Sequence, residues 1–237
     1  MGARRPLLTG LAREAAGDRN LAGGKAAGLA DLAGAGFAVP PGFVLTTAAY
    51  RSFLEENRLA TALRVELERK PMADMRWEEI WDAALRIRSL FLGRPLPARI
   101  ADALAAGLEG LAPGAPLAVR SSAPAEDDGR RSFAGLHESV VDVRGRAALE
   151  DAVRRVWASL WSDAALLYRR ELGLDPGRSG MAVLVQEMVA ADRSGVAFGR
   201  DPRGGGRDAL LVEAVPGPCR LLVDGAVEPD RWEIDRA

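Results

Sequence analysis

The chain has 237 residues, 48% of them hydrophobic, and a formal net charge of −1. This composition is typical of a folded globular protein and lacks the basic excess that a general nucleic-acid-binding protein carries. The single cysteine excludes a disulfide framework and a cysteine metal cluster. No apolar stretch is long enough to cross a membrane, so we expect a cytoplasmic protein with no nucleic-acid or membrane partner.

A glycine pair near the N-terminus is predicted to stand at the start of a helix. Leu29, Leu32 and Ala33 repeat at helical spacing after Gly23-Gly24-Lys25. Main-chain N–H groups beside a lysine ammonium favour an anion at such a position. The alternative is a flexible helix entry with a solvated lysine, and this segment alone leaves both interpretations open.

The next segment is predicted to be mainly helical after one short strand. Val39–Thr46 indicates a rigid proline turn into a buried strand, whose last threonines are suited to cap the following helix. Residues 59–111 indicate two or three helices punctuated by prolines. Trp77 and Trp81 lie on an apolar stripe of this region, and we expect both side chains in the core.

Two strands with a charged loop between them follow. Leu117–Ala123 is an apolar run that contains Arg120, Ser121 and Ser122, and Ser139–Val143 is the second strand. A guanidinium group followed by hydroxyl groups supplies good donors for phosphate oxygens. The first of these strands is therefore a candidate phosphate-binding element.

One long amphipathic helix is predicted after the second strand. Apolar residues from Leu149 to Tyr168 share one face, whereas Ser162 and Arg169 fall on another. We expect this helix to stop near Gly173.

The last part of the chain is predicted to be rich in strands. Met181–Val185 is a nearly continuous apolar run, which indicates a strand covered on both faces. Further strands are expected at 194–199 and 209–214, and the alternation in 221–223 and 232–235 indicates a closing hairpin or meander.

Helices thus dominate the first half and strands the second, which predicts an α/β or α+β architecture with two lobes. We place a helix-rich lobe at 1–112 and a strand-rich lobe at 113–237.

Each candidate phosphate contact has a plain structural alternative. An ion pair with Glu126 would explain Arg120, and a β-bulge would explain Gly135. His137, the only histidine, gives no basis for a metal site or a nucleophile relay, and we expect it to hydrogen-bond within its own loop. Gln186–Val189 either ends a core strand or forms a hinge beside an adenine, and spacing does not choose between these.

Together, the segments resemble the N-terminal ATP-binding domain of the phosphoenolpyruvate synthase, pyruvate phosphate dikinase and rifampicin phosphotransferase family. The matching stretches are Gly23–Leu29, Val39–Val44, Ala118–Ala123 with Ala125–Asp127, Ser132–Ser139, Val185–Val189 and Ser194–Phe198. Their order and spacing agree from about residue 20 to the end of the chain.

The resemblance implies an ATP-grasp-like fold, in which two lobes clamp ATP, and phosphorylation of a histidine on a separate domain or partner chain. Carried over by position, Lys25 and Arg120 would bind and neutralise the ATP phosphates as the catalytic cations. The remaining implied contacts to ATP are Ser121, Gly135 and Ser139 on the phosphate side and Gln186, Glu187 and Met188 on the adenine side.

Two departures from the family pattern limit what the resemblance implies. A glycine-rich turn with a carboxylate is expected where this chain has Val215–Arg220, which contains two prolines and an arginine. The acidic residues that bind Mg²⁺ in the family lie beyond the end of this chain, so the resemblance implies Mg²⁺ with no metal ligand here and a C-terminal truncation relative to the family.

The main hypothesis is therefore an ATP-binding module that works with a histidine-bearing domain or partner chain. The alternatives are a non-catalytic nucleotide sensor or scaffold with a degenerate site and, more weakly, a protein-interaction domain.

Overall fold

The computed structural model describes residues 5–124, 137–175, 177, 179–199 and 209–235. The chain divides into two compact units, with the boundary between Met188 and Val189. Each unit has its own antiparallel sheet. The boundary predicted from the sequence, 112/113, falls inside the first unit, because strands from both sides of it pair in one sheet.

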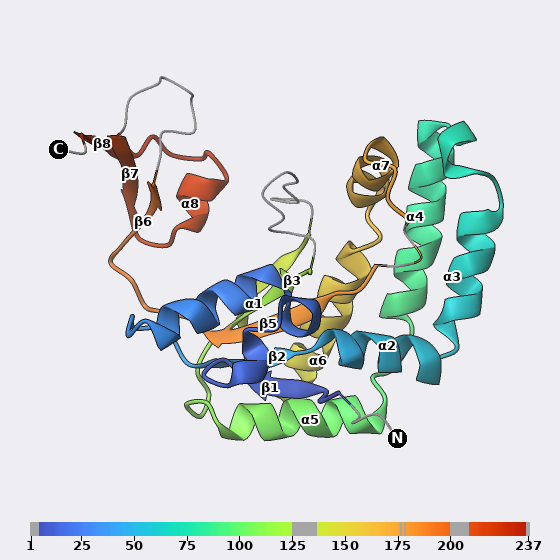
Figure 1. Ribbon diagram of the computed structural model, residues 1–237, viewed down its shortest axis with the longest axis horizontal. Helices are drawn as coiled ribbons and strands as arrows, with labels where there is room; N and C mark the ends of the chain where they lie inside the picture. Colours follow the sequence, from blue (N-terminus) through green and yellow to red (C-terminus); the bar gives the residue numbers. More distant parts are fainter. Residues whose placement is uncertain (1–4, 125–136, 176, 178, 200–208, 236–237) are drawn as a thin grey trace. The chain divides into compact units, whose positions relative to one another are not determined.

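The first unit contains most of the helices (Figure 1). Its strands are β1 (Leu8–Gly10), β2 (Gly42–Leu45), β3 (Leu117–Ser122), β4 (Ser139–Val143) and β5 (Ala182–Glu187). Its α-helices are α1 (Arg19–Gly34), α2 (Thr47–Glu56), α3 (Leu59–Glu68), α4 (Trp77–Leu92), α5 (Ala98–Glu109), α6 (Gly145–Ser159) and α7 (Asp163–Glu171). Two short 3₁₀ helices lie at Glu14–Ala16 and Met72–Asp74.

The five-stranded sheet has the order β1-β2-β5-β3-β4, with every neighbouring pair antiparallel. Strand β5 lies in the middle, and its residues from Ala182 to Gln186 are all buried. This confirms the predicted central strand covered on both faces.

Helix α1 covers one face of the sheet, where Ala22 and Ala26 pack against Val44, Ala182 and Leu184. The other face carries the main core, to which α2, α5 and α6 contribute, with α3, α4 and α7 further out (Figure 1). Burial of this many apolar side chains is the main term that favours folding.

Aromatic rings fill the centre of the main core. Tyr50 and Phe53 of α2 pack against Phe91 and Trp157, with ring centroids 5.0 to 6.0 Å apart. The Thr46 hydroxyl accepts a hydrogen bond from the Ala48 N–H, which confirms the predicted threonine cap of this helix.

The second unit is a small meander sheet of three strands in the order β6-β7-β8. The strands are β6 (Arg193–Phe198), β7 (Ala209–Pro216) and β8 (Asp230–Asp235). The short helix α8 (Arg220–Val223) connects β7 to β8, so the prediction of a strand at 221–223 is wrong. The apolar run at 221–223 is too short to distinguish a strand from one helical turn.

The predicted single helix over 149–168 is also wrong, because the chain breaks it into α6 and α7. Ser162 caps α7: its hydroxyl accepts a hydrogen bond from the Ala165 N–H. The break rotates the face that α7 buries. Arg169, predicted on the polar face, is consequently only 3% exposed.

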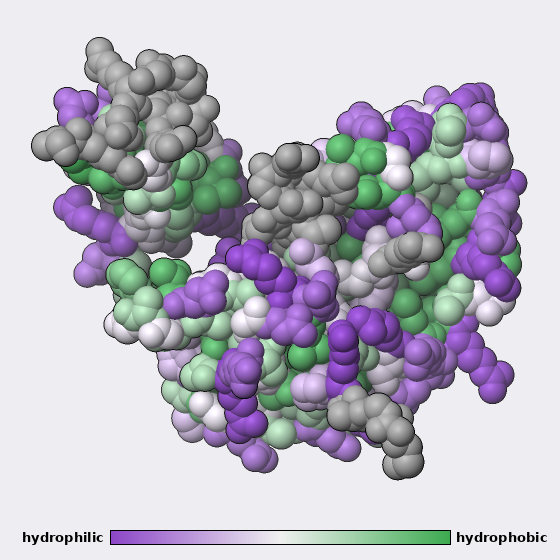
Figure 2. All heavy atoms as spheres, viewed as in Figure 1, coloured by the Kyte–Doolittle hydropathy of each residue, from purple (hydrophilic) through white to green (hydrophobic). Residues whose placement is uncertain are grey.

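The prediction that Trp77 and Trp81 lie in the core is wrong as well. Their exposed fractions are 56% and 47%, and Leu85 on the same stripe of α4 is 50% exposed. Ile80, Ala84, Ile87 and Phe91 form the buried face of this helix instead. Figure 2 shows hydrophilic side chains on the outer side of α3 and hydrophobic ones between α3 and α4.

Candidate functional site

Gly23 interrupts helix α1 and creates a second helix start inside it. Its φ of 79° and ψ of 170° are non-helical, and the chain resumes the helix at Gly24. A Cβ atom at Gly23 would lie 1.9 Å from the Ser122 carbonyl oxygen, so only glycine fits there. The predicted helix start at the glycine pair is thus confirmed, although one turn of helix precedes it.

The glycine turn docks directly on the end of β3. The Gly24 N–H donates to the Ala123 carbonyl at 3.1 Å, and the Ala26 N–H donates to the Ser122 hydroxyl at 3.1 Å. The Ser122 side chain is fully buried. Lys25 lies between these two anchored residues and is thereby fixed at the strand end.

Arg120 and Ser139 come together across the β3–β4 pair, where they are direct partners in register. Arg120 is half-buried and Ser139 is exposed. The sheet thus places a guanidinium and a hydroxyl group next to the strand end that carries the glycine turn.

Ser121 departs from this grouping. Side chains alternate along a strand, so Ser121 points to the face opposite Arg120 and Ser122. Ser121 is 2% exposed, and its strand partner is the core residue Val183. Of the two serines, Ser122 is the one that contacts the glycine turn, a contact that its position in the sequence does not predict.

His137 lies next to this site. Its imidazole hydrogen-bonds the main chain of Ser159 at the end of α6. The loop where we expected its partner lies outside the described residues, so that expectation stays a prediction. Burial, together with the positive charges of Arg169 and Lys25, lowers the pKa of His137 to about 4. The imidazole is therefore neutral near pH 7, and both cations are close enough to act on it.

The residues predicted on the adenine side lie at the other end of the β3–β5 pair. Gln186 pairs with Ala118 in register, whereas Ala182 pairs with Ser122. The two ends are four residues apart, about 14 Å at the rise of an extended strand.

Polar side chains of this second group are held by the protein itself. The Gln186 amide donates to the Pro40 carbonyl at 3.0 Å, and the Glu187 carboxylate accepts from the Ala112 N–H at 2.7 Å. The Met188 sulfur accepts from the Asp142 N–H at 3.1 Å. These bonds fix the segment rigidly at the edge of the first unit.

Gly135 and the acidic residues Glu126, Asp127 and Asp128 lie outside the described residues. Among the residues that the structure does describe, no three His, Cys, Asp or Glu side chains converge as a metal site. Glu138 is paired with Arg155, and Glu213 with Arg231. The described side chains therefore do not fit a Mg²⁺ site.

The comparisons with known proteins cover nearly the whole chain. Residues 19–237 match the family model described as pyruvate phosphate dikinase, AMP/ATP-binding domain.

Within the described ranges, no helix is long and apolar enough to cross a membrane.

Similar proteins include two phosphoenolpyruvate synthases and a rifampicin phosphotransferase. The synthase of Aeropyrum pernix is 39% identical over 92% of this chain and 27% of its own length, and that of Pyrococcus furiosus is 31% identical over 92% and 31%. The phosphotransferase of Streptomyces sviceus is 38% identical over 90% and 24%.

This chain therefore spans about a quarter to a third of the curated relatives it matches. The mixed α/β architecture, the glycine turn on β3 and the family match agree with one another. The chain belongs to the pyruvate phosphate dikinase AMP/ATP-binding domain family.

Proposed function

We propose that this chain binds ATP and positions it for phosphoryl transfer to a histidine on a separate domain or partner chain. The observation that carries the proposal is the docking of the Gly23–Lys25 turn on the end of β3 beside Arg120 and Ser139. In-line phosphoryl transfer depends mostly on positioning and charge neutralisation, which these donors supply.

In this proposal, Lys25 and Arg120 neutralise the phosphates, and Gly135 and Ser139 complete the phosphate side. Ser121 faces away from Arg120 on β3, so its contribution is to the packing that supports the strand end. Ser122 is added as the residue that holds the glycine turn.

Gln186, Glu187 and Met188 form the adenine side. Because the polar side chains of Gln186 and Glu187 are engaged within the protein, the adenine meets main-chain carbonyls and the apolar part of this segment. The adenine amino group is a donor, which a main-chain carbonyl is suited to accept.

In this proposal, the acceptor histidine belongs to a separate domain or partner chain. The relatives named above are phosphoenolpyruvate synthases and a rifampicin phosphotransferase, and this chain covers only a fraction of their length. Mg²⁺ would neutralise ATP phosphates when bound, and among the described residues no cluster of carboxylates is suited to hold it.

Calorimetry with ATP tests the binding step. We expect Lys25→Met to weaken ATP binding at least about tenfold, a loss of one strong charge interaction. Lys70→Met is the matched control, since Lys70 pairs with Glu79 of α4 and belongs to no part of the site. Equal ATP affinity of both variants and the wild type would contradict the assignment of Lys25.

Labelled ATP tests the transfer step. The isolated chain with Mg²⁺ is expected to hydrolyse or exchange ATP at a negligible rate. Addition of the remaining part of a phosphoenolpyruvate synthase, with its histidine domain, is expected to restore labelling of that histidine. Robust Mg²⁺-dependent turnover by the isolated chain would refute the need for a partner.

A second candidate is a nucleotide sensor or scaffold that does not catalyse transfer. The segment that departs from the family pattern favours it, because Arg220 forms an ion pair with Asp224 and Glu213 forms one with Arg231. Tight ATP binding without labelling of any histidine domain would select this candidate over the first.

A further inference from the structure

Helix α7 carries a buried cation. Arg169 of α7 is 3% exposed, and its guanidinium lies 5.7 Å from the centroid of the Trp161 ring. One Nη atom donates to the Leu160 carbonyl at 2.7 Å. Among the described residues, no carboxylate forms an ion pair with it.

This arrangement leaves a positive charge inside the protein. Burial lowers the pKa of Arg169 to about 10, so the group stays charged near neutral pH. A buried charge is costly unless an opposite charge compensates it. The aromatic ring and one carbonyl compensate it only in part, and a bound anion nearby would complete the compensation.

Arg169 is linked to the predicted phosphate residues through hydrogen bonds and through neighbours in the chain. Arg169 holds the Leu160 carbonyl, and the main chain of the preceding residue, Ser159, hydrogen-bonds His137. His137 lies two residues before Ser139, the partner of Arg120 in the β3–β4 register. The positive charges of Lys25 and Arg169 both lower the pKa of His137.

We propose that Arg169 is a positioning residue of the nucleotide site, whose buried charge attracts the phosphate chain of the nucleotide toward Lys25 and Arg120. The proposal rests on the proposed function and deepens it, because it names a third cation for the same ligand. Its effect grows with the number of phosphates on the ligand, since the attraction is electrostatic.

A series of ligands tests this directly. Calorimetry is carried out with adenosine, AMP, ADP and ATP on the wild type, Arg169→Met and Arg169→Lys. We expect Arg169→Met to lose about tenfold in ATP affinity, less for ADP and AMP, and at most about twofold for adenosine. Arg169→Lys, which keeps the charge, is expected to stay within about threefold of the wild type for every ligand.

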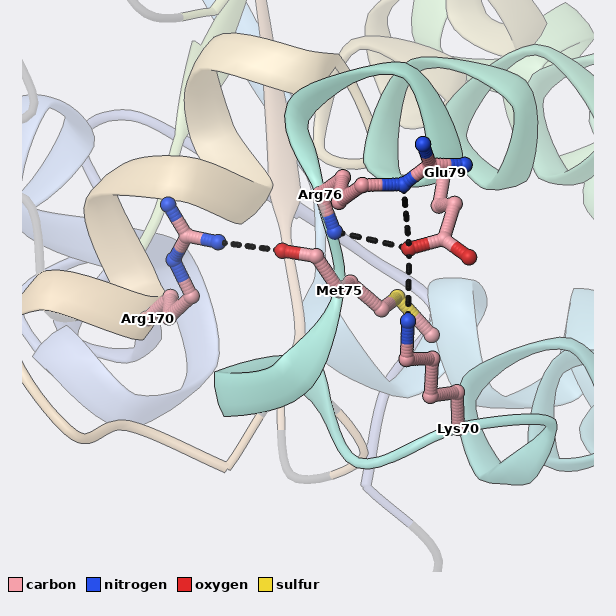
Figure 3. Close-up of polar contacts among 5 residues, drawn as sticks. All are labelled: Lys70, Met75, Arg76, Glu79 and Arg170. Atoms are coloured by element: carbon pink, nitrogen blue, oxygen red, sulfur yellow. Dashed lines mark hydrogen bonds and ion pairs between the residues drawn. The ribbon is translucent and has the colours of Figure 1, made fainter.

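Arg170→Met is the matched control. The guanidinium of Arg170 also donates to a main-chain carbonyl, that of Met75 at 3.0 Å, but it points toward the segment that precedes α4 (Figure 3). There Lys70 and the Arg76 main chain both donate to the Glu79 carboxylate. We expect Arg170→Met to change the affinities for ATP and for adenosine only slightly and by the same factor.

The wild type gives a test that does not depend on the folding of a variant. His137 is the only histidine, so its imidazole signals in NMR spectra are unambiguous. Inorganic tripolyphosphate is expected to shift these signals, and adenosine is expected to leave them in place.

The outcomes separate the inference from the proposed function. A wild type that binds no ATP overturns both. ATP binding that Arg169→Met leaves unchanged, or that it weakens equally for ATP and adenosine, overturns only the role of Arg169. Unshifted histidine signals with tripolyphosphate likewise overturn it.

Discussion

The Ser122 hydroxyl accepts a hydrogen bond from the Ala26 main-chain N–H at 3.1 Å, which joins two segments 96 residues apart in the chain. The bond is buried and caps the helix that resumes after Gly23. It therefore couples the position of Lys25 to the end of β3, and several predictions depend on this coupling.

Ser122→Ala is expected to leave the Ala26 N–H buried without its acceptor. Such a loss destabilises the fold by about 1–3 kcal/mol and loosens the turn that carries Lys25, so the ATP affinity falls as well. Urea unfolding and calorimetry with ATP measure the two effects. Ser52→Ala is the control, because the Ser52 hydroxyl bonds Glu56 at an exposed site on α2; a similar loss in both variants would contradict the coupling.

Gly23→Ala is expected to be more damaging than any other alanine substitution in α1. The positive φ alone costs about 1–3 kcal/mol in a non-glycine residue, and the added Cβ would also overlap the Ser122 carbonyl. Gly28→Ala in the same helix has open space at its Cβ, and we expect a gain of about 0.5–1 kcal/mol. Thermal unfolding of the two variants gives the comparison, and a Gly23→Ala protein as stable as the wild type would refute the close contact.

Arg120→Ala is expected to weaken ATP binding far more than Arg130→Ala or Arg131→Ala, which lie outside the described residues. The reason is that only Arg120 stands on β3, opposite Ser139 and beside the glycine turn. Arg144→Ala serves as a control within the described sheet, because Arg144 forms an exposed ion pair with Asp142. Equal losses of ATP affinity for all four variants in calorimetry would mean that β3 does not contact the phosphates.

Trp157 and Trp81 lie in different environments, so replacing each with alanine is expected to lower the stability of the fold by very different amounts. Trp157 is fully buried and donates from its ring nitrogen to the Met181 carbonyl, so Trp157→Ala should cost about 3–5 kcal/mol. Trp81 is half exposed on α4, and Trp81→Ala should cost about 1 kcal/mol. Denaturant unfolding followed by circular dichroism measures both values, and comparable costs would place Trp81 in the core after all.

The stability of the fold is expected to depend on pH through His137. Its pKa is lowered to about 4 in the folded state, below the ordinary value of 6.5, so the unfolded chain binds more protons between these values. The contribution, on the order of 3 kcal/mol, is complete above pH 6.5 and is lost as the pH falls toward 4. Unfolding free energies at pH 5 and 7 test this, with His137→Gln as the variant in which the histidine contribution disappears.

Local sequence signals correctly predicted most elements of the first unit. The glycine pair marked the helix start at Gly24, and the threonine after β2 marked the start of α2. The continuous apolar run from Met181 marked β5 as the central strand. Each of these signals acts within a few residues, through dihedral preference, capping or burial.

The wrong predictions for α4 and α7 share one cause, which is that the sequence pattern does not specify what an apolar or polar face meets. Trp77 and Trp81 face solvent, although Ile80 and Ala84 of the same predicted stripe are buried, because α4 packs through Ile80, Ala84 and Ile87. Arg169 is buried because the break at Ser162 turns α7 after α6. A single serine cap inside an apolar repeat is too weak a signal to predict that break from the sequence.

The sequence by itself determined the family, the mixed α/β class and the types of donor at the candidate site, because motifs and capping signals are local. Only the tertiary structure decided which serine of β3 holds the glycine turn, that Arg120 meets Ser139, and that Arg169 is buried. Those relationships join segments far apart in the chain through strand register and core packing, and no local preference encodes such a contact.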